Sequence, residues 1–185
     1  MVRKQIRGRR RPAPAGLRAT LDMLADKFRK AVHAADETYA RLGIPHVLIG
    51  GIAVGAYAEP RATQDVDFLV GDEAFETVGA IISFRAGVPL EAAGVPVDSV
   101  PIDPKFRYVY TEAIESAEES DEPGIKLVEP EYLAALKLIS GRRRDLSDVV
   151  ELVAHGLEEE AIHQVVGEFP QLVDRLNATM DEAES

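Results

Sequence analysis

Apolar residues recur every three or four positions in the first well-patterned part of the chain. The positions that follow this spacing are Leu21, Leu24, Phe28, Val32, Ala35, Tyr39 and Leu42. Such spacing places the side chains on one face of an α-helix. Thr20 is a suitable N-cap, and Gly43 with Pro45 just beyond it is a typical stop signal. The pattern therefore predicts one helix over residues 20–42.

A strand, a short helix and a second strand are predicted next. The sequence HVLIGG, residues 46–51, is apolar and ends in two glycines, which is typical of a buried strand and a tight turn. The small apolar stretch IAVGAYA, residues 52–58, indicates a helix packed close to a sheet. After a turn, residues 64–70, QDVDFLV, predict the second strand.

The rest of the chain mixes strand and helix signals and then becomes helical. Helical spacing is present over residues 72–84, and two strands are predicted around a turn at Ala93-Gly94. An acidic helix or loop and a short strand, residues 125–129, come next. Four further helical pieces follow, which begin near Pro130, after Gly141, near residue 158 and at Pro170.

This order predicts an α/β (α+β) fold, in which a small mixed β-sheet is flanked by helices and carries additional helices at both ends. We expect residues 1–16 to form a basic, disordered arm, residues 17–155 the main domain, and residues 156–185 a helical C-terminal tail. The length of 185 residues suits one domain with a sizeable core.

Composition excludes some classes of site. The chain has no cysteine, so disulfides and thiolate metal sites are ruled out. The net charge of −11 argues against a generally basic nucleic-acid-binding surface. Residues 3–11, RKQIRGRRR, nevertheless hold six Arg or Lys, which either contact phosphates or form a solvated tail. Because no apolar run reaches about 20 residues and no signal-peptide pattern is present, we expect a cytoplasmic protein with no membrane segment.

Two carboxylates stand out in the second predicted strand. Residues i and i+2 of a strand point to the same face, so Asp65 and Asp67 are expected to lie side by side, with Arg61 and Thr63 on that face as well. Two adjacent carboxylates repel unless a cation lies between them. Mg²⁺ prefers oxygen ligands and is commonly held by one or two carboxylates and phosphates. The alternative is a strand end where the acids reach solvent or pair with Arg61.

A third carboxylate, Asp98, lies in the apolar strand sequence VPVDSV. If that strand lies beside the Asp65/Asp67 strand, three acids converge, which is enough to hold two metals and to accept a proton from a hydroxyl. The alternative is a carboxylate at a strand edge or turn. Upstream, Gly50 and Gly51 permit close backbone approach, and a helix starting there would present N–H groups suited to phosphate. The pattern is neither a P-loop nor a Rossmann motif.

Taken together, GGIAVGAYAEPRATQDVD (residues 50–67), Asp98 and EYLAALKLISGRRRDLSDVVEL (residues 131–152) resemble the minimal nucleotidyltransferase superfamily, with the DNA polymerase β-like fold. Within it, the order and spacing are most similar to the AbiEii type of toxin–antitoxin nucleotidyltransferase. The resemblance covers roughly residues 45–153. One departure is Gly51, because many superfamily members have a phosphate-binding serine there.

The resemblance implies a site for each of these motifs. Gly50 and Gly51 would contact nucleotide phosphates, and Asp65, Asp67 and Asp98 would bind Mg²⁺ (or Mn²⁺). Lys137 would reach the phosphates, although a lysine extending from an amphipathic helix has the same appearance in sequence. The site thus predicted is Gly50, Gly51, Arg61, Thr63, Asp65, Asp67, Asp98 and Lys137.

The functional hypothesis is a nucleotidyltransferase that moves a nucleoside monophosphate from a nucleoside triphosphate to an acceptor hydroxyl on RNA (such as tRNA) or protein. It would be the toxin of a toxin–antitoxin pair, with an antitoxin protein as partner. One alternative is a non-catalytic nucleotide- or RNA-binding module on the same fold. Another is an interaction domain whose acids are merely solvated, with Asp98 far from Asp65 and Asp67. Asp145 and Asp148 are interpreted as structural partners of the nearby arginines.

Overall fold

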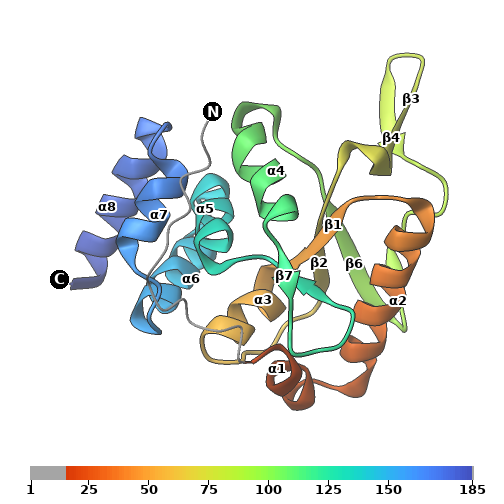
Figure 1. The fold of residues 1–185 in the computed structure, drawn as a ribbon, viewed down its shortest axis with the longest axis horizontal. Coiled ribbons are helices and arrows are strands. Elements are labelled where there is room, and N and C mark those ends of the chain that lie inside the picture. Colours follow the sequence, from red (N-terminus) through yellow and green to blue (C-terminus); the bar gives the residue numbers. More distant parts are fainter. Residues whose placement is uncertain (1–15, 185) are drawn as a thin grey trace.

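The computed structural model describes residues 16–184, which combine helices and strands and end in a run of helices (Figure 1). The α-helices are α1 (Leu17–Met23), α2 (Asp26–Leu42), α3 (Gly50–Tyr57), α4 (Arg107–Glu115), α5 (Pro130–Ser140), α6 (Arg143–Ala154), α7 (Glu159–Val166) and α8 (Pro170–Glu184). The strands are β1 (His46–Ile49), β2 (Val66–Val70), β3 (Phe75–Val78), β4 (Ile81–Phe84), β5 (Glu91–Ala92), β6 (Val95–Val100), β7 (Glu118–Glu119) and β8 (Lys126–Leu127). The short 3-10 helices are η1 (Asp72–Ala74) and η2 (Pro104–Phe106). The predicted basic arm lies outside the described residues.

A mixed sheet of six strands organises the fold, in the order β5-β6-β2-β1-β8-β7. The β1–β2 pair is antiparallel, whereas β6 runs parallel to β2 and β8 runs parallel to β1. This arrangement confirms the predicted α/β class with a small mixed sheet flanked by helices. It also confirms the strand predictions around residues 46–49, 66–70 and 95–100.

Helices cover the sheet, and a group of helices lies to one side of it. Helix α2 packs against β1, β2, β5 and β6, and Tyr39 of this helix contacts Phe68 of β2 with ring centroids 5.2 Å apart. The Tyr39 hydroxyl also forms a 2.6 Å hydrogen bond with Ser99 of β6. On the side of α3, helix α5 contacts α3, α4, α6, α7 and α8, so that α5 to α8 form a helical group beside the sheet (Figure 1).

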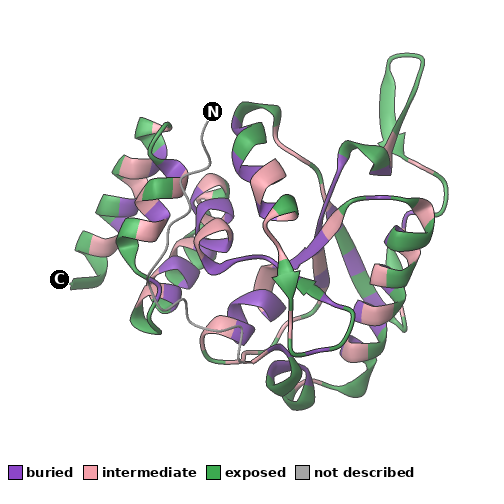
Figure 2. Ribbon diagram, viewed as in Figure 1, coloured by how far each residue is buried: buried purple, intermediate pink, exposed green. Residues whose placement is uncertain are grey.

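The hydrophobic core is continuous from the sheet into this helical group (Figure 2). The large side chains with almost no exposure include Tyr39, Phe68, Leu48, Leu69, Leu133, Leu138 and Leu152. Because these residues come from α2, β1, β2, α5 and α6, their burial joins the sheet to helices α5 and α6. Within residues 16–184, no helix is both long and apolar enough to cross a bilayer.

The predicted single helix over residues 20–42 is wrong. The chain forms α1 and α2, separated at Leu24, whose backbone is extended, and Ala25, which precedes the first residue of α2. Thr20 is a buried residue inside α1 rather than an N-cap. The apolar spacing continues across the break because both helices bury their faces in the same core, so periodicity alone did not reveal the two ends.

The helical prediction over residues 72–84 is also wrong. This segment forms η1 and a two-stranded hairpin of β3 and β4, which projects from the body (Figure 1). Gly79 at the turn has φ +65°, a left-handed conformation that favours glycine. The strands are rich in β-branched residues, among them Val78, Ile81 and Ile82, all highly exposed. Strand propensity and the glycine turn therefore outweigh the helical spacing.

Candidate functional site

Strands β2 and β6 place two carboxylates next to each other. The two strands are parallel neighbours, and their register pairs Asp67 with Asp98. Phe68 and Ser99, the next residue in each strand, both contact Tyr39 of α2. Because side chains alternate along a strand, Asp67 and Asp98 point to the opposite face of the sheet. The contacts of Phe68 and Ser99 with α2 thus fix which face of the sheet the acids occupy.

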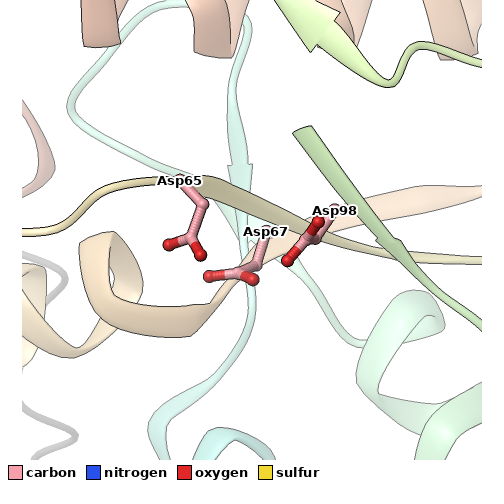
Figure 3. Close-up of side chains that lie close together, drawn as sticks. All are labelled: Asp65, Asp67 and Asp98. Carbon is pink, nitrogen blue, oxygen red and sulfur yellow. The ribbon is translucent and has the colours of Figure 1, made fainter. Parts of the chain in front are cut away.

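Asp65 completes a cluster of three acids (Figure 3). One carboxylate oxygen from each of Asp65, Asp67 and Asp98 lies within 4.8 Å of the other two. Asp65 and Asp67 are half-buried and Asp98 is exposed, so the cluster opens to solvent. The interpretation in which Asp98 lies far from the other two acids is therefore wrong.

The electrostatics of the cluster favour a bound cation. Burial, followed by the charges of Asp65 and Asp98, raises the pKa of Asp67 from its ordinary value of 3.8 to about 6. Lys137 and a hydrogen bond from the backbone N–H of Gly51 act in the opposite direction and lower this pKa. Three oxygen donors at this separation form the kind of donor set that hard divalent cations such as Mg²⁺ and Mn²⁺ take. The residues present therefore fit a divalent metal.

A glycine turn lies directly against this cluster. Gly50 begins α3 with φ +73°, and a Cβ atom built on it would lie 1.9 Å from Oδ2 of Asp67. A Cβ on Gly51 would instead lie 3.4 Å from Oγ1 of Thr63, at ordinary contact distance. The two glycines therefore have different roles: Gly50 makes room for the Asp67 carboxylate, and Gly51 presents its N–H to it.

Arg61 and Thr63 do not lie on the strand face where they were predicted. Strand β2 begins at Val66, and residues 58–65 form an irregular segment between α3 and β2. Thr63 still reaches the cluster, because its hydroxyl donates to Oδ1 of Asp65 at 3.1 Å. Arg61 forms no hydrogen bond or ion pair with Asp65, Asp67 or Asp98. It pairs with Asp148 of α6 through Nη1–Oδ1 and Nη2–Oδ2 distances of 2.6 and 2.7 Å.

Lys137 is held between two carboxylates of α6. Its Nζ atom lies 2.6 Å from Asp145 and 2.9 Å from Asp148. Burial tends to raise the pKa of Asp145, but hydrogen bonds from Lys137, Ser140 and Arg142 outweigh that effect and hold this pKa below its usual value. Lys137 is thus an anchored cation near Asp67, and it does not extend freely from the helix.

The importance of Asp148 was underestimated from sequence. It was interpreted as a partner of nearby arginines, but its arginine partner, Arg61, is 87 residues away in the chain. Its other cationic partner is Lys137. No local pattern in a single sequence signals a pairing at that separation, whereas the neighbouring acids Asp65 and Asp67 were visible from their spacing alone.

Similarity to known proteins is found at the level of structure. No protein-family model and no curated protein sequence matches the chain. Among solved structures, an antigenic nucleotidyltransferase-like protein from Paracoccidioides brasiliensis is similar, with 17% sequence identity and a TM-score of 0.43. The similarity covers 83% of this chain and 94% of that protein.

Proposed function

We propose that the chain is a Mg²⁺- or Mn²⁺-dependent nucleotidyltransferase. The observation that carries the proposal is the convergence of Asp65, Asp67 and Asp98 beside the start of α3. In the reaction, an acceptor hydroxyl oxygen forms a bond to the α-phosphorus of a nucleoside triphosphate. The bond between that phosphorus and the bridging oxygen to the β-phosphate breaks, pyrophosphate leaves, and the hydroxyl proton passes to a base.

The residues suit this reaction in distinct ways. Asp65, Asp67 and Asp98 would hold the metal, which when bound neutralises phosphate charge and lowers the pKa of a coordinated hydroxyl. Asp98, the most exposed of the three, is the one most accessible to an incoming acceptor, and it would take its proton. Catalysis of this type depends mainly on positioning and charge neutralisation.

A second set of residues would receive the triphosphate. The backbone at Gly50 and Gly51 and the anchored ammonium of Lys137 lie on the side of the cluster that includes Asp67. Thr63 would contribute a hydroxyl beside Asp65, and Arg61 would add positive charge from the segment before it. Donors of these kinds bind phosphate oxygens well.

The finer parts of the proposal rest on the order of motifs in the sequence. That order resembles the AbiEii type. We therefore propose that the acceptor is RNA, such as tRNA, or protein, and that the chain acts as a toxin with an antitoxin partner.

The test is to incubate the protein with triphosphates labelled at the α- or γ-phosphate, Mg²⁺, and total cellular RNA or protein. Transfer of the α-label alone is expected. Mg²⁺-dependent nucleotide binding without transfer to any acceptor would instead support a non-catalytic binding module.

Stabilisation by metal is expected to depend on pH. The pKa of Asp67, about 6, lies above its ordinary value of 3.8, so the folded, metal-free protein holds this proton more tightly than the unfolded chain does. This group therefore destabilises the metal-free fold as pH rises from about 4 through 6. A metal needs the ionised carboxylate, and below pH 6 it must displace the proton.

We therefore expect Mg²⁺ to raise the melting temperature more at pH 7.5 than at pH 5. The measurement is thermal unfolding with and without Mg²⁺ at the two pH values, at constant ionic strength. Ca²⁺-free buffer with matched NaCl controls for general salt screening. An increase in melting temperature that is equal at both pH values would contradict a role for Asp67 in binding the metal.

A further inference from the structure

The three carboxylates of the cluster are not held in the same way. Asp67 lies within the paired strand β2, and Asp98 lies opposite it in β6, so ladder hydrogen bonds fix both backbones. Asp65 precedes the first residue of β2 and belongs to the irregular segment 58–65. Side-chain contacts therefore have to fix this segment if Asp65 is to stay within reach of the other two acids.

Two side chains of the segment make such contacts. Thr63 donates to Asp65, but both residues belong to the same segment, so this bond cannot tie it to the rest of the fold. Arg61 reaches across to α6, where its Nη2 donates a 2.7 Å hydrogen bond to Oδ2 of Asp148 and its Nη1 lies 2.6 Å from Oδ1, in an ion pair without a second hydrogen bond. A charge-assisted hydrogen bond of this kind is stronger than a neutral one, and the second close approach of opposite charges adds to it. The Arg61–Asp148 pair is thus the long-range charged anchor of the segment.

Asp148 also anchors the cation near the cluster. Its side chain is only 1% exposed, and Nζ of Lys137 lies 2.9 Å from its Oδ2. One buried carboxylate thereby joins α6, helix α5 and the segment that carries Asp65. Asp145, one helical turn earlier, shares Lys137, but its other partners are Ser140 and Arg142 at the turn between α5 and α6. Asp145 forms no hydrogen bond or ion pair with residues 58–65.

We propose that Asp148 is a positioning residue of the metal site: by binding Arg61 and Lys137 together, it holds Asp65 and the Lys137 ammonium in place around Asp67. This inference rests on the proposed function, in that it takes the three acids as a cation site. Buried ion pairs often add little net stability compared with apolar residues of similar size. The ion pairs of Asp148 matter instead because they fix the positions of helix α5, through Lys137, and of the segment 58–65, through Arg61.

The test measures Mn²⁺ affinity by calorimetry, which does not depend on activity. The proteins compared are the full-length wild type, Arg61→Gln, Asp148→Asn and the double variant. Loss of a group that orients metal ligands typically weakens metal binding, and we expect about a tenfold loss in each single variant. The double variant should bind no more weakly than the weaker single variant, because both changes remove the same anchor. Losses that multiply in the double variant would overturn the proposal.

Asp145→Asn is the matched control, because Asp148 still holds both Arg61 and Lys137 in that variant. Its Mn²⁺ affinity should stay within about twofold of wild type, and a loss as large as that of Asp148→Asn would overturn the proposal. A purely structural role for Asp148 would lower the melting temperature but leave the Mn²⁺ affinity of the folded protein unchanged, and that result would also overturn the proposal.

If Asp148→Asn does not fold, the Mn²⁺ affinity of Arg61→Gln decides the proposal, since the Arg61 side chain is 32% exposed and its replacement should be tolerated. Absence of Mn²⁺ binding in the wild type would overturn the proposed function itself.

Discussion

Asp67→Asn is expected to abolish nucleotidyl transfer while leaving the metal-free protein at least as stable as wild type. Burial and the charges of Asp65 and Asp98 raise the pKa of the Asp67 carboxyl to about 6, so its ionisation costs more free energy in the folded protein than in the unfolded chain. A neutral amide of the same shape removes that repulsion and still accepts the hydrogen bond from Gly51. The same change removes an anionic ligand that the metal requires.

The expected loss in transfer rate is about a thousandfold or more, because metal stabilisation of a phosphoryl transition state contributes several kcal/mol. Initial rates with an α-labelled triphosphate measure this loss, and thermal unfolding in EDTA measures the metal-free stability. Asp72→Asn is the control, since it makes the same chemical change in an exposed ion pair with Arg107. Such surface pairs contribute little, so its rate and stability should stay near wild type. Transfer by Asp67→Asn at the wild-type rate would contradict the assigned role.

Gly50→Ala is expected to destabilise the protein by roughly 2–5 kcal/mol and to remove metal binding. The left-handed backbone at φ +73° costs a non-glycine residue about 1–2 kcal/mol. The added Cβ would also lie 1.9 Å from Oδ2 and 2.5 Å from Cγ of Asp67, so the carboxylate or the start of α3 must move. Forcing atoms into a packed site costs roughly 1–3 kcal/mol more.

Alanine variants of two other glycines distinguish the cost of backbone strain from the cost of the steric clash. Gly43→Ala imposes similar strain at φ +67°, but nothing lies within 4 Å of its added Cβ, so only about 1–2 kcal/mol is expected. Gly51→Ala adds a Cβ without positive φ and at 3.4 Å from Thr63, so a small change is expected. Chemical denaturation gives the three stabilities, and calorimetry with Mn²⁺ gives the binding. If Gly50→Ala bound Mn²⁺ as wild type does, the close approach of the turn to Asp67 would have no role in the site.

The acidic cluster could be predicted from sequence because its parts have local signatures. Asp65 and Asp67 are two residues apart at the start of an apolar strand, and Asp98 interrupts another apolar strand. Apolar flanking residues show that both strands are buried, and buried strands of a small sheet have few places to lie. The sequence left open whether the two strands are neighbours, and the structure pairs Asp67 with Asp98.

The errors share a physical cause, which is that short-range patterns do not encode long-range contacts. The hairpin of β3 and β4 has apolar spacing compatible with a helix, but Val78, Ile81 and Ile82 are exposed, so burial does not select one period there. The Arg61–Asp148 pair joins residues 87 positions apart. Placing Arg61 on the strand face followed from extending β2 five residues too far toward the N-terminus, because an irregular segment has no periodicity to contradict the extension.

The most direct measurement of the central claim is a crystal structure of the full chain with Mn²⁺ and a non-hydrolysable nucleoside triphosphate, recorded with anomalous scattering from manganese. We predict an anomalous peak among the carboxylates of Asp65, Asp67 and Asp98, with the triphosphate next to Gly50 and Gly51. Full manganese occupancy elsewhere, with no peak at these three carboxylates, would contradict the account.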